Sequence, residues 1–311
     1  VDKFIQKKDL DAVVLIDYMG PNIRLGNKLR NSYPNIPIIY YIAPQEWAWS
    51  LGDKGTTDLI GFSNKILAIF RAEADFYTNR GGNVTWVGHP MLDTIKALPN
   101  KEDSMKKIGL NIDQKLLLIF PASRSQELKY VLPELLEAAL KLQKEDSSLY
   151  VVLPSALPEF DCHLTKALEN YGINGRVIPA DETDRWKPIL FAAADLAFAK
   201  SGTINMELAI NNVPQIVAYK VSRITAFLAR KLLRFRVEHI SPVNLLLNER
   251  LIPELLQEEL RSNSIVDQAR PLLEKSLTRS SMLEGYAKLR TNLGEKGVTD
   301  RAAREVFNFL I

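Results

Sequence analysis

Arg124 stands where an apolar run gives way to a helical pattern, and its type and position suit the binding of an anion. The run Leu116–Phe120 is followed by Pro121-Ala122-Ser123-Arg124, and the helix is expected to begin near Ser125. A helix N-terminus presents free N–H groups and partial positive charge, and an arginine adds paired donors for phosphate. Ser123 and Arg124 are therefore candidate phosphate ligands. Considered alone, Arg124 is also compatible with an exposed arginine beside a helix cap.

A second candidate loop is Lys200-Ser201-Gly202-Thr203, which follows the apolar run Phe191–Ala199 and precedes a helical pattern containing Glu207. Glycine lets backbone approach a ligand closely, and a glutamate one turn inside the helix could accept hydrogen bonds from a ribose. The alternative is an ordinary helix start, with Ser201 or Thr203 as the cap and Glu207 near the positive helix end. The residue types support both interpretations equally.

Asp17 ends the apolar run Ala12–Ile16 and precedes a Gly-Pro turn. An aspartate at the end of a buried strand could act as a general base if its pKa suits the reaction. The alternative is an aspartate that caps a helix starting near Asn22.

The three histidines do not form a metal-binding pattern. His89, His163 and His239 lie far apart and lack the spacing of metal ligands. The sequence therefore predicts no metal site and no cofactor, and it favours a structural role for His89 at a strand end.

The segment from Val221 to Val237 is basic and amphipathic. It contains five cations and no acid, interleaved with leucine, isoleucine and phenylalanine. Such a helix can lie in the headgroup region of an anionic bilayer, although a core helix with a solvated basic face is the commoner structure. The residues expected to face a membrane are Arg223, Phe227, Arg230, Lys231 and Arg234.

Short apolar runs alternate with helical patterns along the chain, which predicts an α/β fold with two Rossmann-like, doubly wound parallel sheets. The charged, proline-containing stretch after Pro90 indicates a boundary between an N-terminal domain (1–95) and a C-terminal domain (96–311). The chain starts at Val1 in what resembles the middle of an α/β unit, so we expect the first domain to be N-terminally truncated. Two such domains would bind a ligand beyond the carboxyl ends of their strands.

Composition excludes several classes of protein. The chain has 311 residues, 46% of them hydrophobic, and a net charge of +3, which is too small to indicate nucleic-acid binding. The single cysteine, Cys162, rules out an internal disulfide framework. No apolar run approaches the roughly 18 residues of a spanning helix, so any membrane contact is expected at the surface.

Taken together, the motifs resemble the lipid-A-disaccharide synthase family of GT-B glycosyltransferases. The matching segments occur in the order expected for that family and are spread over nearly the whole chain: Tyr40-Tyr-Ile-Ala-Pro-Gln-Glu-Trp-Ala-Trp49, Val87-Gly-His-Pro-Met-Leu-Asp93, Phe120-Pro-Ala-Ser-Arg-Ser-Gln-Glu127, Ala199-Lys-Ser-Gly-Thr-Ile-Asn-Met-Glu207, Pro214-Gln-Ile-Val-Ala-Tyr-Lys220 and Pro253-Glu-Leu-Leu-Gln257.

The resemblance implies transfer of 2,3-diacylglucosamine from its UDP donor to 2,3-diacylglucosamine 1-phosphate (lipid X), with release of UDP. It implies that Asp17 and Arg124 are the essential acid and arginine, and that Ser201, Gly202, Thr203 and Glu207 bind the nucleotide. Asn244 and Gln257 are expected close to that region. It also implies a cytoplasmic enzyme, peripheral on the inner membrane, that acts on lipid substrates and does not bind nucleic acid, with an oligomer possible.

Three departures from the family pattern keep alternatives open. The Gly-rich loop that usually follows the first strand is absent, Tyr18-Met19-Gly20-Pro21 replaces a pattern with a second acid, and Ser50 stands where an arginine often follows Trp-Ala-Trp. The alternatives are another GT-B glycosyltransferase, a nucleotide-sugar epimerase, or an inactive homologue that binds UDP or membrane.

Overall fold

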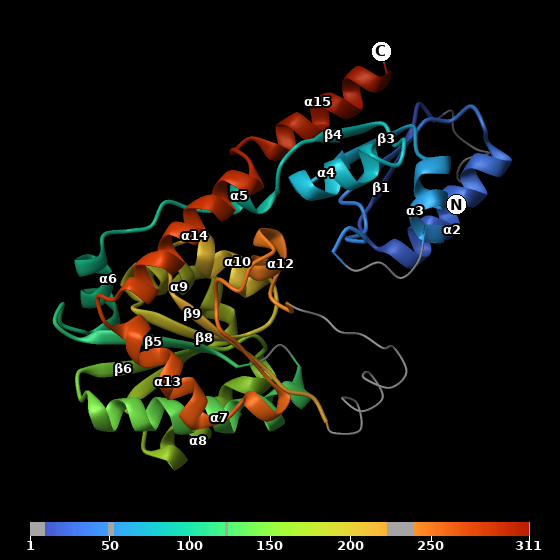
Figure 1. The fold of residues 1–311 in the computed structure, drawn as a ribbon. Coiled ribbons are helices and arrows are strands. Elements are labelled where there is room, and N and C mark those ends of the chain that lie inside the picture. Colours follow the sequence, from blue (N-terminus) through green and yellow to red (C-terminus); the bar gives the residue numbers. More distant parts are fainter. Residues whose placement is uncertain (1–9, 49–52, 122–123, 223–238, 311) are drawn as a thin grey trace. The chain divides into compact units, whose positions relative to one another are not determined.

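The chain forms two compact units, each with its own parallel sheet (Figure 1). The computed structural model describes residues 10–48, 53–121, 124–222 and 239–310. Unit 1 consists of Val1–Ile95 and Arg290–Ile311, and unit 2 consists of Lys96–Leu289. The division between residues 95 and 96 lies at the boundary expected from the sequence. Residues 290–311, expected in the second domain, belong to unit 1.

Unit 1 contains four parallel strands in the order β1-β2-β3-β4. Their bounds are β1 (Val13–Ile16), β2 (Ile38–Tyr41), β3 (Lys65–Ala68) and β4 (Val84–Trp86). The connecting helices are α2 (Met19–Ser32), α3 (Asp53–Phe62) and α4 (Arg71–Thr78). All three connections advance in one direction, so right-handed crossovers place these helices on one face. Tyr40, Leu59 and Phe62 are buried in the core of this unit.

The C-terminal helix α15 (Val298–Leu310) joins unit 1 through the short helix α5 (Met91–Thr94). The Asp93 carboxylate accepts hydrogen bonds of 2.6, 3.1 and 2.8 Å from the backbone N–H groups of residues 297–299. Arg301 Nε donates to the carbonyl of Val87 at 3.0 Å, and Glu305 accepts from the hydroxyl of Thr85 at 3.0 Å. The expected C-terminal domain of 96–311 is therefore corrected at its end, because these contacts attach α15 to unit 1.

Unit 2 contains six parallel strands in the order β10-β9-β8-β5-β6-β7. Their bounds are β5 (Lys115–Phe120), β6 (Leu149–Pro154), β7 (Gly175–Ile178), β8 (Leu196–Lys200), β9 (Gln215–Tyr219) and β10 (Glu254–Leu256). From β5 the chain moves outward to β6 and β7, and from β8 it moves the opposite way to β9 and β10. The strand order therefore reverses between β5 and β8, which is where doubly wound sheets bind ligands.

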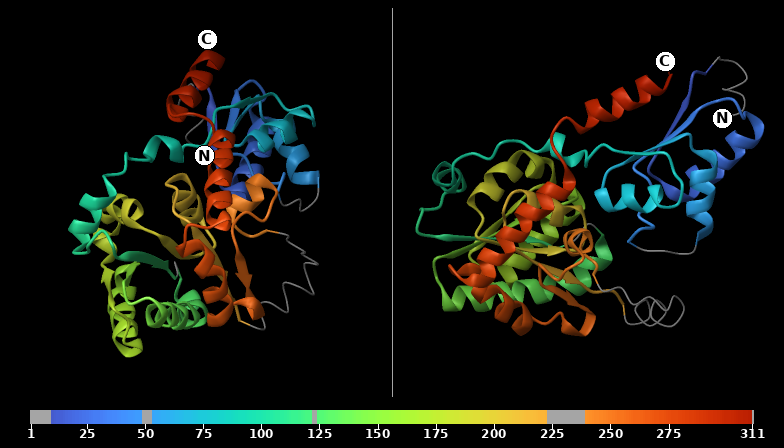
Figure 2. Two further views of the ribbon diagram at one scale, coloured as in Figure 1. Left: turned by 60° about the vertical axis from the view of Figure 1, so that its left-hand side comes forward. Right: turned by 45° about the horizontal axis from the view of Figure 1, so that its top comes forward.

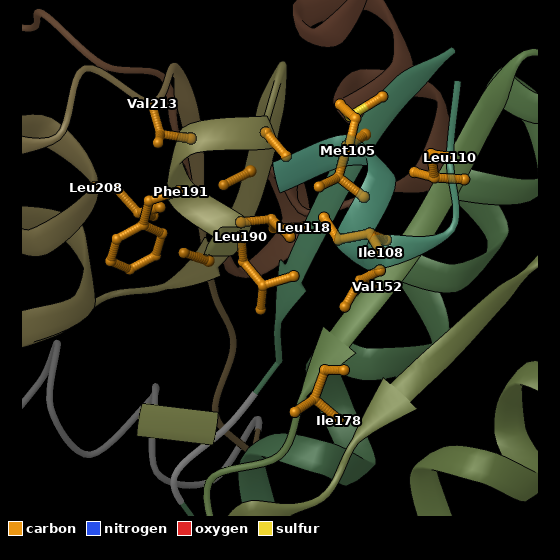
Figure 3. Close-up of a cluster of buried hydrophobic side chains, with 14 residues drawn as sticks. Met105, Ile108, Leu110, Leu118, Val152, Ile178, Leu190, Phe191, Leu208 and Val213 are labelled. Carbon is orange, nitrogen blue, oxygen red and sulfur yellow. The ribbon is translucent and has the colours of Figure 1, made fainter. Parts of the chain in front are cut away.

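Helices cover both faces of this sheet (Figures 1 and 2). They are α6 (Lys101–Ile108), α7 (Ser125–Glu145), α8 (Pro158–Tyr171), α9 (Ala180–Ala193), α10 (Thr203–Ile210), α12 (Pro242–Leu247), α13 (Ser262–Leu273) and α14 (Leu277–Leu293), with a 3-10 turn η1 (Gln257–Glu259). Figure 3 shows the buried cluster to which Met105 and Ile108 of α6 contribute, together with Leu118 and Leu190. The C-terminal part of the chain forms three successive helices, α13, α14 and α15.

Replacing Asp93 with alanine should loosen the attachment of α15. The variant loses an acceptor for three backbone N–H groups, and loss of a capping side chain costs about 1 kcal/mol. These N–H groups, that of Thr299 first, hold the pKa of Asp93 at about 2. The contribution of the Asp93 carboxylate to the free energy of unfolding is therefore fully present above pH 4 and is lost as the pH falls through 2. Hydrogen exchange of the α15 amides at neutral pH measures the loss.

Asp300→Ala is the matched control, because it removes an exposed acid from the first turn of the same helix. Its effect should be smaller, since only the weaker interaction with the helix dipole is lost. Equal exchange rates in both variants would show that Asp93 does not hold the helix.

Candidate functional site

Arg124 is the residue immediately before α7, at the carboxyl end of β5. Its side chain is exposed, and among the described residues its guanidinium makes no hydrogen bond or ion pair. Its backbone N–H donates to Glu127 Oε2 at 3.2 Å, and the N–H of Glu127 donates to the Arg124 carbonyl at 3.0 Å. The Glu127 carboxylate thus satisfies the N–H of the N-cap residue, as the glutamate of a capping box does, and leaves the arginine side chain able to reach a ligand.

The second loop starts α10 without the cap that the sequence suggests. Gly202 occupies the N-cap position, and neither Ser201 nor Thr203 caps the helix with its side chain. Instead, Asn205 Oδ1 accepts the N–H of Gly202 at 2.8 Å, and the Ser201 hydroxyl donates to the carbonyl of Ile240 at 2.8 Å. Thr203 is exposed in the first turn. The alternative of a simple Ser or Thr cap is therefore wrong.

The two loops lie side by side because β5 and β8 are neighbours. Phe120 pairs with Ala199 in the parallel ladder, so both strands end at the same level. Lys200 Nζ then binds Glu127 Oε1 at 2.9 Å, and both side chains are largely buried, with exposures of 19% and 12%. The ion pair joins the first turn of α7, which follows Arg124, to the end of β8, which precedes Gly202, at the point where the strand order reverses.

A second ion pair repeats this arrangement two turns further along α7. Glu134 Oε1 binds Lys220 Nζ at 3.2 Å, and Lys220 follows the end of β9. The other carboxylate oxygen of Glu134 accepts the N–H of Ser262 at 2.9 Å. Glu127 and Glu134 are seven residues apart, which places them on one face of the helix. α7 is thereby fixed to two neighbouring strand ends.

A pocket of about 540 Å³ lies at this edge of unit 2. Its lining residues are Tyr130, Glu134, Lys220, Val221, Ser222, Gln257, Glu258, Leu260 and Arg261. Gln257 has a left-handed backbone, with φ 50°. In the amide orientation that satisfies its oxygen and nitrogen, the oxygen accepts the N–H of Val221 at 3.1 Å and the nitrogen donates to the Val221 carbonyl at 3.2 Å. Gln257 thus lies directly after the carboxyl end of β10, on the wall of this pocket.

Asn244 is a buried residue of α12 that makes a network of hydrogen bonds. Its side chain is fully buried, and its amide donates to the carbonyl of Ile252 and to Glu254 Oε1, both at 2.9 Å. Its oxygen accepts the N–H of Ile252 at 2.9 Å. Glu254 also accepts the backbone N–H groups of Ile240 and Ser241. Asn244 therefore holds, through Glu254, the segment that accepts the Ser201 hydroxyl, and its expected place near the nucleotide stays a prediction.

Glu207 lies in α10 and pairs with Lys187 of α9. Lys187 Nζ lies 3.1 Å from Glu207 Oε2 and 3.2 Å from an oxygen of Asp184. Burial lowers the pKa of Lys187, but the two carboxylates outweigh this effect and leave the pKa raised. The side chain of Glu207 is 25% exposed.

Asp17 lies at the end of β1, in unit 1. It is exposed, and both Asp17 and Tyr18 have left-handed backbones, with φ of 49° and 48°. Tyr18 is the N-cap of α2 and makes no side-chain cap, so the alternative role of Asp17 as a helix cap is wrong. Within the part of the chain that the structure describes, the Asp17 carboxylate makes no hydrogen bond or ion pair.

Two titratable groups with shifted pKa values lie in unit 1, the half-buried His89 and the buried Glu73. Burial lowers the pKa of His89 to about 4, and His89 Nδ1 accepts the N–H of Met91 at 3.2 Å, which fits the structural role expected for this residue. Burial raises the pKa of Glu73 to about 8, against the opposing effect of three backbone N–H donors, one from Ala43. No sequence pattern marks Glu73, because only the fold brings Ala43 close to it.

Several predicted residues lie outside the described part of the chain, so the structure gives no position for them. They are Ser123, Arg223, Phe227, Arg230, Lys231 and Arg234. Among the described residues there is no group of three or more histidine, cysteine or acidic side chains arranged to bind a metal ion, and no helix long and apolar enough to cross a bilayer.

Solved structures with this fold define the class of protein. A putative UDP-N-acetylglucosamine 2-epimerase from Listeria monocytogenes superposes with a TM-score of 0.63 at 14% identity, covering 98% of this chain and 76% of its own. A glycosyltransferase from Rickettsia africae superposes with a TM-score of 0.59 at 12% identity, covering 99% of this chain and 79% of its own. The fold is therefore that of the GT-B glycosyltransferases and epimerases, as the sequence predicts.

Comparison of the amino-acid sequence with known proteins identifies the family, whereas the solved structures show only the fold. The family model described as lipid-A-disaccharide synthetase matches residues 1–306. The lipid-A-disaccharide synthase of Prochlorococcus marinus is 58% identical over 308 residues, which are 99% of this chain and 79% of that protein. The chain belongs to the lipid-A-disaccharide synthase family of glycosyltransferases, which confirms the resemblance seen in the motifs.

Gly202→Ala tests whether backbone of the second loop approaches a nucleotide. A Cβ at this position would contact only Lys200 Cε, at 3.5 Å, and the backbone (φ 160°, ψ −166°) is extended and open to any residue. The variant should therefore fold normally but bind UDP at least about tenfold more weakly, because the methyl group occupies the space of the ligand. Titration calorimetry with UDP measures the change.

Gly61→Ala is the control, since a Cβ there meets nothing within 4 Å in unit 1. It should leave the affinity for UDP unchanged. Wild-type affinity in Gly202→Ala would show that the ligand does not approach this loop.

Proposed function

We propose that this protein transfers 2,3-diacylglucosamine from UDP-2,3-diacylglucosamine to the 6-hydroxyl of lipid X, releasing UDP and forming a β-1,6-linked disaccharide. Membership of the lipid-A-disaccharide synthase family supports the reaction. The observation that carries the proposal for the site is the contact between the Arg124 loop and the Ser201–Thr203 loop, where the Glu127–Lys200 ion pair joins them at the strand-order reversal.

Arg124 and the N-termini of α7 and α10 stabilise the negative charge that develops on departing UDP. Helix N-termini and arginine are both suited to phosphate, and preorganised donors lower a barrier when they face developing charge. Because Glu127 neutralises Lys200, the local positive charge comes mainly from Arg124 and the helix ends. Ser123, Ser201, Gly202 and Thr203 bind the diphosphate in this proposal.

Asp17 acts as the general base that takes the proton from the acceptor hydroxyl. It lies at a strand end of unit 1, and its exposed carboxylate has no partner among the described residues. The donor is α-linked and the product is β-linked, so one displacement with inversion is sufficient. Glu207 accepts hydrogen bonds from the ribose and Gln257 lies beside the nucleotide, on the wall of the pocket.

The substrates carry acyl chains, so we propose that the enzyme works on the cytoplasmic face of the inner membrane. The basic segment of residues 221–237 supplies cations and apolar side chains for an anionic surface. An oligomer is compatible with this arrangement.

Measuring UDP release with acylated and unacylated acceptors tests the proposed substrate class. We expect turnover only with the acylated acceptor. Equal use of unacylated sugars would favour another GT-B glycosyltransferase, C2 inversion of a UDP-sugar without an acceptor would favour an epimerase, and UDP binding without turnover would indicate an inactive homologue.

Arg124→Ala should weaken stabilisation of the transition state by about 2–4 kcal/mol, because a donor to developing charge is lost. This corresponds to a decrease in kcat of roughly 30- to 1000-fold. Steady-state UDP release measures it. Lys144→Ala removes the same charge from the opposite end of α7 and should leave kcat unchanged. Full turnover by Arg124→Ala would remove the arginine from the mechanism.

Replacing Arg230, Lys231 and Arg234 together by glutamine should weaken binding to vesicles of anionic phospholipid. Each cation near such a surface contributes about 1 kcal/mol, so the three account for roughly a 100-fold change in partitioning. Vesicle sedimentation at low and high salt measures the effect.

The matched control replaces three exposed lysines of unit 2, namely Lys106, Lys107 and Lys166. It changes the net charge equally and should leave partitioning nearly unchanged. Similar losses in both triple variants would mean that net charge, and not the segment, determines binding.

A further inference from the structure

The backbone of Asp17 is held in a conformation that most residues avoid. Asp17 and Tyr18 are consecutive left-handed residues, with φ of 49° and 48°. Side chains crowd the backbone in this region, so two such residues in succession persist only where surrounding contacts fix them. Strain of this kind is found at turns that aim a side chain for a function.

Three hydrogen bonds fix the main chain of Asp17. Its carbonyl oxygen accepts from the Tyr40 hydroxyl at 2.8 Å and from Asn22 Nδ2 at 2.6 Å. Its N–H donates to the carbonyl of Tyr41 at 3.0 Å, and Asn22 Nδ2 also lies 3.0 Å from the carbonyl of Ile16. All of these bonds go to backbone atoms, and no described residue occupies the carboxylate, which is therefore the group that we consider for chemistry.

Tyr40 is a rigid donor. Its side chain has no exposed surface, and its ring packs against Phe62 with centroids 6.2 Å apart in the core of unit 1. Burial, partly opposed by the hydrogen-bond partner Asn22, raises the pKa of Tyr40 to about 12, so the hydroxyl keeps its proton at any pH of interest. A buried phenol of this kind has one position from which it can donate.

We propose that Tyr40 and Asn22 are positioning residues that hold the left-handed turn at Asp17 and thereby aim its carboxylate at the acceptor hydroxyl. The inference rests on the role of Asp17 in the proposed function. Neither residue touches the substrate in this account. Both act through the Asp17 carbonyl, from β2 and from the first turns of α2.

Tyr40→Phe tests the proposal, because it keeps the buried ring and removes only the hydroxyl. Misplacing a reacting group by about 1 Å can cost 100-fold, so kcat should fall between about 10- and 100-fold. KM should stay within about threefold, since substrate binding is not altered. Asn22→Ala, at a less buried position, should act in the same direction and serves if Tyr40→Phe fails to fold.

Tyr41→Phe is the matched control on the next residue of the same strand. The Tyr41 hydroxyl is also buried, but within the described residues it has no hydrogen-bond partner. Removing it should leave kcat within about twofold of the wild type. A loss of kcat in Tyr41→Phe equal to that in Tyr40→Phe would overturn the inference, since any buried hydroxyl would then have the same effect.

A double-mutant cycle with Asp17→Asn separates positioning from a general loss of structure. General bases contribute about 10²–10⁴-fold, so residual turnover of Asp17→Asn remains measurable. In that background Tyr40→Phe should have little further effect on kcat. An equal effect of Tyr40→Phe in both backgrounds would overturn the inference, and so would wild-type kcat in both Tyr40→Phe and Asn22→Ala. Wild-type activity in Asp17→Asn would instead overturn the role of Asp17 as the general base.

Discussion

The parallel pairing of β5 with β8 is the constraint on which the site of unit 2 depends. Leu117–Phe120 pair with Leu196–Ala199, although almost eighty residues of chain separate them. From these two strands the chain proceeds in opposite directions, so no helix crosses over the gap between their carboxyl ends. Two helix N-termini consequently meet at one place, with Arg124 beside them.

Partly buried ion pairs then set the distances between the loops. Glu127 with Lys200 and Glu134 with Lys220 join one helix to the ends of β8 and β9. Exposed pairs contribute little to stability, whereas pairs removed from water must keep both partners, because an uncompensated buried charge is costly. These interactions therefore fix the positions of the strand ends and of α7 at this edge of the sheet more than they stabilise the fold. In unit 1 a neutral buried donor, the Tyr40 hydroxyl, holds the chain at the end of β1 by its hydrogen bond to the Asp17 carbonyl.

Most strands could be predicted from the sequence, because both faces of a parallel sheet are buried and the strands are continuous apolar runs. Helix α6 was missed, since Lys101–Ile108 is mostly charged and buries mainly Met105 and Ile108 against another helix. The helix after the Lys200–Thr203 loop is predictable from the sequence, but its cap is not, because the capping side chain of Asn205 comes from inside the helix. The positions of Asn244 and α15 depend on contacts with Glu254 and Asp93, which strand and helix patterns do not encode.

We propose that these residues perform glycosyl transfer with inversion between two acylated sugars. The most direct test is to incubate this protein with UDP-2,3-diacylglucosamine and lipid X and to determine the linkage of the product by NMR. The account predicts a β-1,6-linked disaccharide formed together with one equivalent of UDP. An α-linked product, or UDP released without any disaccharide, would contradict it.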